Sequence, residues 1–389
     1  MYEKGQFGIT KGPLLLRVYQ NRVALMWETE TERACRLYYG RDQKLESYIE
    51  STGERVQYET KKEVVGTINK TAFIHKVWLE DLEAGQTYSY SIAGSQTRSK
   101  VYEFRTVRAN TNEARFVVYG DSRTYPENHR KLVELIKNLN VDFVVHSGDL
   151  VSRGDSYEQW GPQFFEPLKG LAETMPIYIA KGNHEGNNGN YEKLLIPQGQ
   201  KNSFGFDYGP VHYFCADNVS RGLRTETQLK LITADAEASK AQWKFAGYHV
   251  PSLNFGGHRS AWGHPDALPS LAKAGIDFVL SGHSHQYERF RPIAPRPGTH
   301  GSYVTYITTG GGGAPLHDVT PSLYHASAKE VHHFCLFDIK GNKLTMDTID
   351  IDGEVIDHLE LVKTDGRLNK QYLSTAVPME EIQHHQDLQ

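Results

Sequence analysis

The strongest constraint in the sequence is a set of five short apolar segments that each end in a side chain able to bind a metal. These segments end in Gly120-Asp121, Gly148-Asp149, Gly182-Asn-His-Glu185, Tyr248-His249 and Gly282-His-Ser-His285. Short β-branched apolar runs are typical of buried strands, and parallel strands bring their carboxyl ends to one edge of a sheet. We therefore expect these side chains to meet at that edge and form a metal site.

Composition limits the class of protein. The chain has 389 residues, of which 39% are hydrophobic and 23% charged, values typical of a globular protein long enough for two domains. Its net charge of −4 offers no basic excess to neutralise a phosphate backbone, so it is not expected to bind a nucleic-acid scaffold. No apolar run approaches the ~20 residues of a membrane span. The three scattered cysteines, Cys35, Cys215 and Cys335, exclude a disulfide framework and a thiolate metal cluster.

The start of the chain gives a weak indication of compartment. Residues 1–6 contain no apolar signal core. This start fits either a cytosolic protein or a chain that lacks its leader, and of the two we favour the extracytoplasmic alternative.

Residues 9–107 are predicted to form an all-β sandwich. Short apolar or alternating segments follow one another between turn signals, a spacing typical of antiparallel sandwiches. The segment Leu79-Glu-Asp-Leu-Glu-Ala-Gly-Gln-Thr-Tyr-Ser-Tyr90 resembles the corner of fibronectin type III domains. Because such a sandwich carries no chemistry of its own, we expect it to position its neighbour or to bind a partner.

After a polar linker, residues 113–362 alternate between strand-like and helix-like patterns. Such alternation indicates a parallel sheet covered by helices. The helical patterns lie at 129–139, 157–168, 225–239 and 265–274. The domain ends in a predicted β meander, and the polar residues 363–389 that follow are predicted to be a mobile tail.

The ordered motifs Gly-Asp, Gly-Asp, Gly-Asn-His-Glu, His and Gly-His-x-His resemble those of the calcineurin-like metallophosphoesterases. Three features are similar to the purple acid phosphatase branch: the preceding sandwich, the run Gly282-His-Ser-His-Gln-Tyr-Glu-Arg289 and the position of His258. The resemblance implies an α/β/β/α sandwich for residues 113–362. It also implies a phosphohydrolase that cleaves small-molecule phosphate monoesters or diesters with a hydroxide bridging two metal ions.

The same resemblance implies the metal ligands. They are Asp149 as the bridge, Asn183, His249 and His283 on one metal, and Asp121 and His285 on the other. Carboxylate, amide and imidazole groups suit Fe, Mn or Zn, and no thiolate competes for softer metals. Two divalent or trivalent ions are therefore the expected cofactors.

Three further histidines are candidates for substrate contact. His184 follows a ligand, and we expect it to stabilise the phosphoryl group or to protonate the leaving alkoxide. His258 matches a substrate-facing histidine of the purple enzymes, and His264 in the same loop is the alternative to it.

The sequence departs from the family pattern at the first metal. Most members add a His two residues after the first Asp, and the purple enzymes add a Tyr three residues after the bridging Asp; here these positions hold Arg123 and Ser152. A guanidinium stays protonated and is no ligand. Arg123 either clamps the substrate phosphate as a catalytic residue or pairs with a neighbouring acid. His129 is a candidate replacement ligand, its alternative being an ordinary residue of the first helical turn.

Two functions are compatible with these features. The first is a dinuclear metal-dependent phosphohydrolase. The second is a metal-depleted, inactive phosphoesterase-like protein that acts as a binding or scaffold module through its β-sandwich. Arg123 favours the second, whereas the intact ligand set around Asp149 favours the first.

Overall fold

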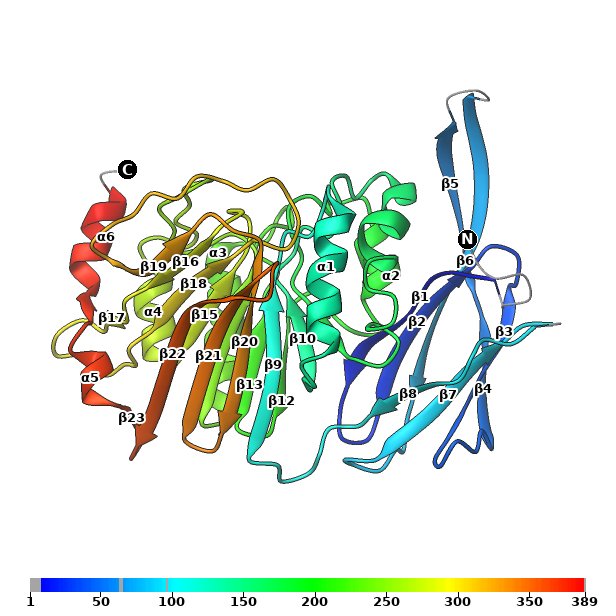
Figure 1. Ribbon diagram of the computed structural model, residues 1–389, viewed down its shortest axis with the longest axis horizontal. Coiled ribbons are helices and arrows are strands. Elements are labelled where there is room, and N and C mark those ends of the chain that lie inside the picture. Colours follow the sequence, from blue (N-terminus) through cyan, green and yellow to red (C-terminus); the bar gives the residue numbers. More distant parts are fainter. Residues whose placement is uncertain (1–7, 63–65, 96, 388–389) are drawn as a thin grey trace. The chain divides into compact units, whose positions relative to one another are not determined.

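The computed structural model describes residues 8–62, 66–95 and 97–387 (Figure 1). The chain divides into two compact units. Unit 1 comprises Met1–Asn110, Arg153–Tyr178 and Asn188–Lys201, and unit 2 comprises Thr111–Ser152, Ile179–Asn187 and Asn202–Gln389. Among the described residues, no helix combines the length and the apolar character that a membrane crossing requires.

Unit 1 contains two four-stranded antiparallel sheets, which confirms the predicted all-β sandwich. The first sheet has the order β1 (Ile9–Val18), β2 (Val23–Thr29), β6 (Gly66–Leu79) and β5 (Glu54–Lys62). The second has the order β4 (Ser47–Thr52), β3 (Ala34–Gly40), β7 (Thr87–Ala93) and β8 (Tyr102–Arg105). At the corner before β7, the Tyr88 hydroxyl accepts the N–H of Glu83 at 2.9 Å, a contact typical of sandwich corners.

Two segments of the predicted second domain, 153–178 and 188–201, group with unit 1 instead. One reason is a buried hydrogen bond, which the Tyr157 hydroxyl donates to the Glu28 carboxylate of β2. The elements here are the 3₁₀-helix η1 (Tyr157–Gln159), the π-helix η2 (Gly161–Phe165) and the helix α2 (Asn190–Leu195). The strand β11 (Ile177–Ile179) spans the boundary of the segment and is part of a sheet described below for unit 2. The helix predicted at 157–168 is confirmed over Tyr157–Phe165, as a 3₁₀-helix followed by a π-helix, and its aromatic side chains are buried.

Unit 2 contains two seven-stranded mixed sheets. The first has the order β11, β10 (Phe143–His146), β9 (Glu113–Tyr119), β20 (His333–Lys340), β21 (Lys343–Asp350), β22 (Val355–Thr364) and β23 (Arg367–Leu368). The second has the order β12 (Phe204–Tyr208), β13 (Val211–Cys215), β14 (Trp243–Tyr248), β15 (Phe278–Ser281), β18 (Thr305–Thr309), β16 (Tyr287–Phe290) and β19 (His325–Lys329). β9 and β10 are parallel, as are β13, β14, β15 and β18, whereas β20 to β22 form the predicted antiparallel meander.

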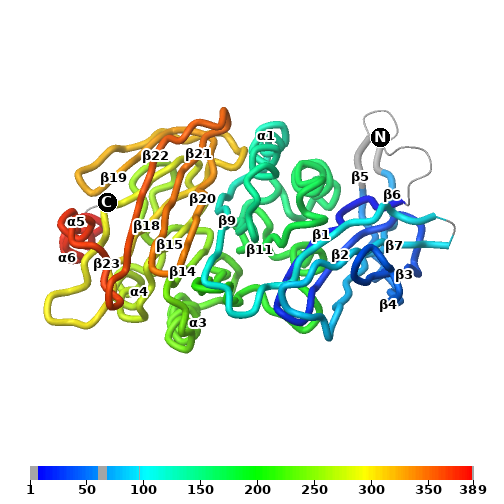
Figure 2. Tube along the Cα trace, turned by 60° about the horizontal axis from the view of Figure 1, so that its bottom comes forward, coloured from blue at the N-terminus to red at the C-terminus, as the bar shows by residue number. Residues whose placement is uncertain are grey.

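The two sheets of unit 2 pack face to face through phenylalanines. The ring of Phe116 on β9 lies 5.3 Å from that of Phe245 on β14, and Phe337 on β20 lies 5.6 Å from Phe278 on β15. The main helices of the unit are α1 (Pro126–Lys137), α3 (Thr225–Ala238) and α4 (Ala267–Lys273). α1 and α3 lie on opposite outer sides of the paired sheets (Figure 2). This arrangement confirms the predicted α/β/β/α sandwich.

The described C-terminal residues 363–387 are not the expected tail, and the last two residues of that predicted tail, 388–389, lie outside the described part of the chain. Residues 363–387 continue β22 and then form β23, α5 (Lys370–Leu373), β24 (Val377–Pro378) and α6 (Met379–Asp387), with β24 pairing with β17 (Ile293–Ala294). Val377, Met379 and Ile382 are buried in the same core cluster as residues of α3 and α4. These few apolar side chains anchor a segment whose overall polarity suggests a tail.

An ion-pair cluster on the outer face of the second sheet gives a test of this fold. His212 of β13 is buried; its Nδ1 lies 2.9 Å from Asp207 Oδ1 of β12, and its Nε2 lies 3.2 Å from Asp235 Oδ2 of α3. Burial alone would lower the pKa of His212, but hydrogen bonding and the charges of these two carboxylates raise it to about 9. Because the unfolded value is about 6.5, the pair stabilises the fold fully below pH 6.5 and loses this effect as the pH rises through 9.

We predict that the His212→Gln variant has a lower unfolding free energy than wild type, and that this difference becomes smaller as the pH rises. The difference should be on the order of 1 kcal/mol larger at pH 6 than at pH 10, since exposure of both carboxylates screens the pair. Urea unfolding of both proteins with a chelator present measures it. A difference that stays constant over this pH range would show that His212 is not charged in the folded protein.

Candidate metal centre

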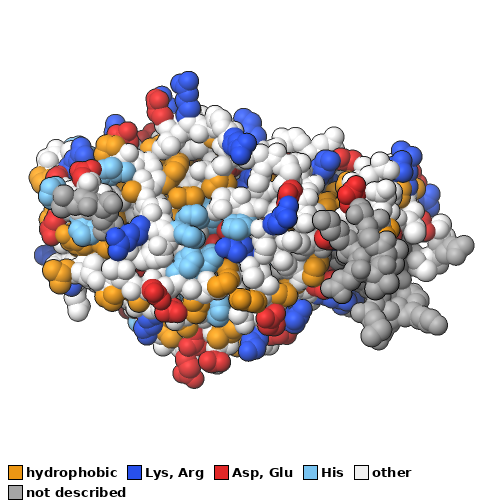
Figure 3. Space-filling model, turned by 90° about the horizontal axis from the view of Figure 1, so that it is seen from above, with side chains coloured by type: hydrophobic (Ala, Val, Ile, Leu, Met, Phe, Trp, Pro, Cys, Tyr) orange, Lys and Arg blue, Asp and Glu red, His pale blue; other side chains and the backbone are white. Residues whose placement is uncertain are grey.

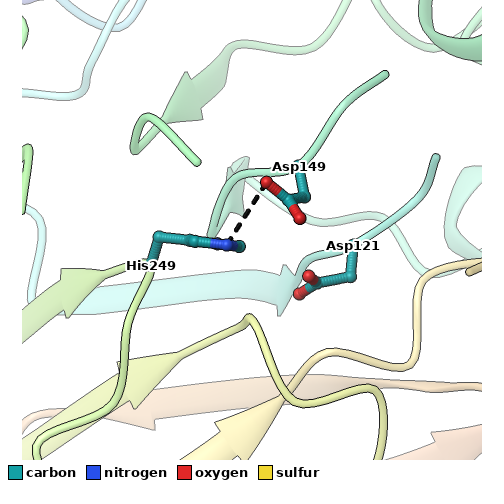
Figure 4. Close-up of side chains that lie close together, drawn as sticks. All are labelled: Asp121, Asp149 and His249. Carbon is teal, nitrogen blue, oxygen red and sulfur yellow. Dashed lines mark ion pairs between the residues drawn. The ribbon is translucent and has the colours of Figure 1, made fainter. Parts of the chain in front are cut away.

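The candidate ligands lie in loops at the carboxyl ends of strands from both sheets of unit 2. These loops follow β9, β10, β11, β14 and β15. Backbone hydrogen bonds join them: the N–H of Gly120 donates to Thr309 O at the end of β18, and the N–H of Gly282 donates to His249 O. Figure 4 shows Asp121 and Asp149 on neighbouring loops, with the His249 ring directed at Asp149.

Unusual backbone angles aim these side chains. Asp121, Asp149 and His283 have φ of 59°, 58° and 68°, a left-handed conformation that is uncommon outside glycine and is held only by surrounding structure. The preceding glycines leave space for the ligands. A Cβ on Gly282 would lie 2.3 Å from Asp121 Oδ2, and one on Gly182 would lie 2.3 Å from Asp149 Oδ1. Crowding of this kind accounts for the Gly before Asn183 and before His283.

Asp121, Asp149 and His249 each offer a candidate ligand atom within 4.8 Å of the other two, and Asn183 and His283 adjoin them. His249 Nε2 lies 2.9 Å from Asn183 Oδ1 and 3.3 Å from Asp149 Oδ1, and His283 Nδ1 lies 3.0 Å from Asn183 Oδ1. Atoms that bind one cation at about 2.1 Å and at right angles to one another are about 3 Å apart. His249 Nδ1 lies 2.9 Å from Ser147 O; donation there leaves the Nε2 lone pair for a metal. This set fits a divalent cation.

The charges of the site also fit a cation. Asp121 and Asp149 are 0% and 1% exposed. Burial would raise the pKa of Asp149, but His249 and His184 hold it well below its usual range. Burial would likewise lower the pKa of His249, but Asp149 and Asp121 raise it to about 10. A proton on His249 therefore balances these carboxylates, and a bound divalent cation would displace that proton.

The remaining ligands, Asp121 and His285, share a second set with Asp149. His285 Nε2 lies 3.5 Å from Asp121 Oδ1. Arg123 lies at the same place: its Nε is 3.4 Å from Asp149 Oδ2, and its Nη2 is 3.4 Å from His285 Nε2. Of the two alternatives for Arg123, the structure shows the ion pair with an acid. With three ligands and a guanidinium beside two of them, this set does not fit a cation as it stands.

Two other candidates lie elsewhere. His129 Nε2 is 2.9 Å from the Tyr119 hydroxyl beneath α1, so His129 does not replace the missing ligand. His264 Nε2 is 2.7 Å from Asp387 Oδ1 of α6. Because this partner comes from the segment predicted to be a tail, no local pattern separates His264 from the substrate-contact candidates.

His184 and His258 lie beside the ligand sets without belonging to them. His184 Nδ1 is 2.7 Å from Ser152 O, so that nitrogen carries the hydrogen, and Nε2 lies 3.8 Å from Asp149 Oδ2. The exposed ring of His258 lies 4.9 Å from that of His283. Histidine side chains gather around a Lys or Arg side chain on this face of the molecule (Figure 3).

Sequence reasoning missed His317, which joins this group. Its ring stacks on His285 at 4.1 Å and 18°, and its Nδ1 accepts the backbone N–H of His285 at 3.1 Å. It also lies 4.5 Å from the His258 ring. Burial, together with these two imidazoles, lowers the pKa of His317 to about 4, which keeps it neutral. The only sequence signal is its place shortly after the glycine run at 310–313.

Glu185 is a second residue whose role the sequence did not reveal. Its buried carboxylate accepts the N–H groups of Asp149, Leu150 and Gly182 at 3.0, 2.7 and 2.6 Å. Burial and the charge of Asp149 raise the pKa of Glu185 to about 7. Glu185 thereby ties the loop that carries Asp149 to the loop that carries Asn183.

Comparison with known proteins agrees with this geometry. Residues 114–287 match the calcineurin-like phosphoesterase family, and residues 15–106 match the N-terminal domain of purple acid phosphatases. The chain thus matches both domain families of the purple acid phosphatase branch of calcineurin-like phosphoesterases. This confirms the resemblance drawn from its ordered motifs.

Among curated proteins similar to this chain is "Probable inactive purple acid phosphatase 1" of Arabidopsis thaliana, 26% identical over 63% of this chain and 49% of that protein. Another is "Acid phosphatase type 7" of Mus musculus, 25% identical over 66% of this chain and 65% of that protein. The chain thus spans about half to two thirds of the length of these relatives. One of these names describes a probable inactive protein and the other an acid phosphatase, so relatedness alone does not decide activity.

Two solved structures share the fold. The purple acid phosphatase PPD1 from yellow lupin seeds has a TM-score of 0.76 and 17% identity, covering 94% of this chain and 76% of that one. The structure of PhoD has a TM-score of 0.65 and 12% identity, covering 100% of this chain and 99% of that one. At these identities the likeness concerns the fold alone.

The role of Glu185 gives a test of the candidate metal centre. Glu185→Gln replaces one acceptor oxygen by an NH₂ group that opposes backbone N–H donors. We expect metal affinity to fall by roughly 10- to 100-fold, as is usual when a group that orients a metal ligand is lost. Calorimetric titration of the metal-free protein with Mn²⁺ measures this.

The matched control is Glu173→Gln, a buried carboxylate of unit 1 that accepts the N–H of Gly170. It should leave Mn²⁺ affinity unchanged. An equal loss of affinity in both variants would show general destabilisation rather than a role for Glu185 at the centre.

Proposed function

We propose that this phosphoesterase-family chain is an active metal-dependent phosphohydrolase of small-molecule phosphate esters. The observation that supports the proposal is the buried group of Asp121, Asp149 and His249, with Asn183 and His283 joined to it at neighbouring separations of 2.9 to 3.3 Å, about the spacing of atoms around one cation. A divalent cation held there supplies Lewis acidity and a water of lowered pKa. The half-buried imidazole of His184 and the exposed one of His258, beside the candidate ligands, supply the other requirement of ester hydrolysis, which is a proton for the leaving group.

Among these imidazoles, His184 is placed best for proton donation. Its backbone N–H donates to Asp149 Oδ1 at 2.9 Å, and its Nδ1 is engaged by Ser152 O, which together fix the ring. Nε2 is then the atom that would carry a proton to the leaving oxygen. His258, more exposed and on another loop, would contact the phosphoryl oxygens.

The dinuclear form of this function would add a second cation between Asp121, Asp149 and His285. The rival function is the inactive binding or scaffold module. Metal content and turnover separate these alternatives, because the scaffold requires neither a tightly bound cation nor hydrolysis of any ester.

Asp149→Asn tests the function directly. Since even a group that merely orients a ligand contributes about 10- to 100-fold to metal affinity or activity, loss of the central carboxylate should exceed 100-fold in both. Metal content after reconstitution with Mn²⁺, Fe²⁺ or Zn²⁺ and hydrolysis of p-nitrophenyl phosphate and bis(p-nitrophenyl) phosphate are the measurements. Asp155→Asn, at an exposed aspartate paired with Arg153, is the control that should change neither. Absence of turnover by wild type with every metal would favour the scaffold.

His184→Ala separates chemistry from metal binding. The variant should keep its metal, while kcat falls by roughly 10²- to 10⁴-fold, the range for a lost general acid. The loss should be smaller for p-nitrophenyl esters than for alkyl esters, because a nitrophenolate leaves without being protonated. Equal losses would place His184 on the phosphoryl oxygens instead. Loss of metal would show that His184 is a ligand.

A further inference from the structure

Arg123 brings a permanent positive charge into the set formed by Asp121, Asp149 and His285. Its side chain is 14% exposed, and the Asp149 and His285 side chains it contacts are 1% and 2% exposed. A guanidinium keeps its proton under all ordinary conditions. The charge at this position is therefore part of the chain rather than taken up from solution.

The guanidinium uses the atoms that a second cation would need. His285 Nδ1 lies 2.7 Å from Pro315 O and carries its hydrogen there, so the lone pair of His285 is on Nε2. Arg123 Nη2 approaches that same Nε2 at 3.4 Å, and Arg123 Nε approaches Asp149 Oδ2 at 3.4 Å. A cation could bind these two atoms only if the Arg123 side chain moved away. While the guanidinium stays, its positive charge repels the cation.

Local structure holds Arg123 in this position. Its backbone N–H donates to Asp149 O at 3.2 Å, and its Nη1 donates to Thr124 Oγ1 at 3.1 Å. Thr124 has a φ of 76°, which is an outlier for a β-branched residue. The same Thr124 hydroxyl lies 3.0 Å from Ser152 Oγ. The loops after β9 and β10 thus meet through Thr124 and support the guanidinium.

We infer that Arg123 takes the place of the second cation, so that the centre holds one divalent cation and one fixed guanidinium. Three of the five guanidinium N–H groups serve Asp149, Thr124 and His285 among the described residues. The other two are available to a phosphoryl oxygen of the ester. The inference deepens the proposed function and rests on it for the substrate, whereas the number of cations is independent of turnover.

The experiment counts metal in three proteins. Wild type, Arg123→His and Arg123→Gln are stripped with a chelator, reconstituted with Mn²⁺ and analysed by calorimetry, elemental analysis and electron paramagnetic resonance. Wild type should bind one equivalent and give the signal of isolated Mn²⁺. Arg123→His, which replaces a fixed cation by a neutral imidazole, should bind two equivalents and give the signal of a spin-coupled pair. Arg123→Gln removes the charge without adding a good ligand and should keep one tight equivalent.

A second arm tests the contact with phosphate. Inorganic phosphate should bind the one-metal form of Arg123→Gln roughly 10- to 100-fold more weakly than that of wild type, the cost of losing a charged hydrogen-bond donor. Equal phosphate affinity in these two proteins would show that the Arg123 guanidinium does not contact the phosphate.

The outcomes separate the inference from the proposed function. Two tight equivalents with a coupled signal in wild type would overturn the inference, even if the protein hydrolyses esters. One equivalent in folded Arg123→His would overturn the claim that Arg123 is what excludes the second cation. One equivalent in wild type, a coupled pair in Arg123→His and no turnover in either would retain the inference and overturn the function.

Discussion

The carboxylates of Asp121 and Asp149 are both fully buried in one small site, and the rest of the centre depends on supplying them with positive charge. A buried carboxylate without compensation is strongly unfavourable. Hydrogen bonds from backbone N–H groups, such as that of His283 to Asp121, provide part of the compensation. A positive charge near His249, as a proton or a metal, and the guanidinium of Arg123 provide the rest. The two buried carboxylates therefore require positive charge nearby whether or not a substrate is bound.

Backbone geometry is what allows two carboxylates to approach so closely. The left-handed angles at Asp121, Asp149 and His283 each cost on the order of 1–3 kcal/mol. Such strain persists only where the surroundings leave no alternative, and here the loops are hydrogen bonded to one another across two sheets. Those sheets are in turn locked by stacked and edge-on phenylalanines, including Phe116 and Phe245. The aromatic core thus maintains the strain that positions the candidate metal ligands.

Features that depend on local sequence pattern could be predicted, whereas features that depend on contacts between residues distant in the chain could not. Apolar runs mark strands, and parallel strands share an edge, so the ligand loops could be brought together from the sequence alone. The partner of His129 is Tyr119, and the neighbour of His317 is His285, yet no local pattern connects either pair. The C-terminal segment contains too few apolar residues to stand out, although a handful of buried ones suffices to hold it. Glu185 was visible in its motif, but its three backbone donors come from two loops.

A guanidinium and a metal ion compensate buried carboxylates in different ways. A metal ion is exchangeable, so a site that needs two of them loses its balance of charge whenever either is scarce. A guanidinium is covalently attached and directional, and it offers a planar set of donors suited to carboxylate and phosphate oxygens. With Arg123 between Asp149 and His285, part of the positive charge remains when the metal leaves. The carboxylate shared by both ligand sets then stays paired in the metal-free protein, which keeps the remaining ligands in place for one cation to return.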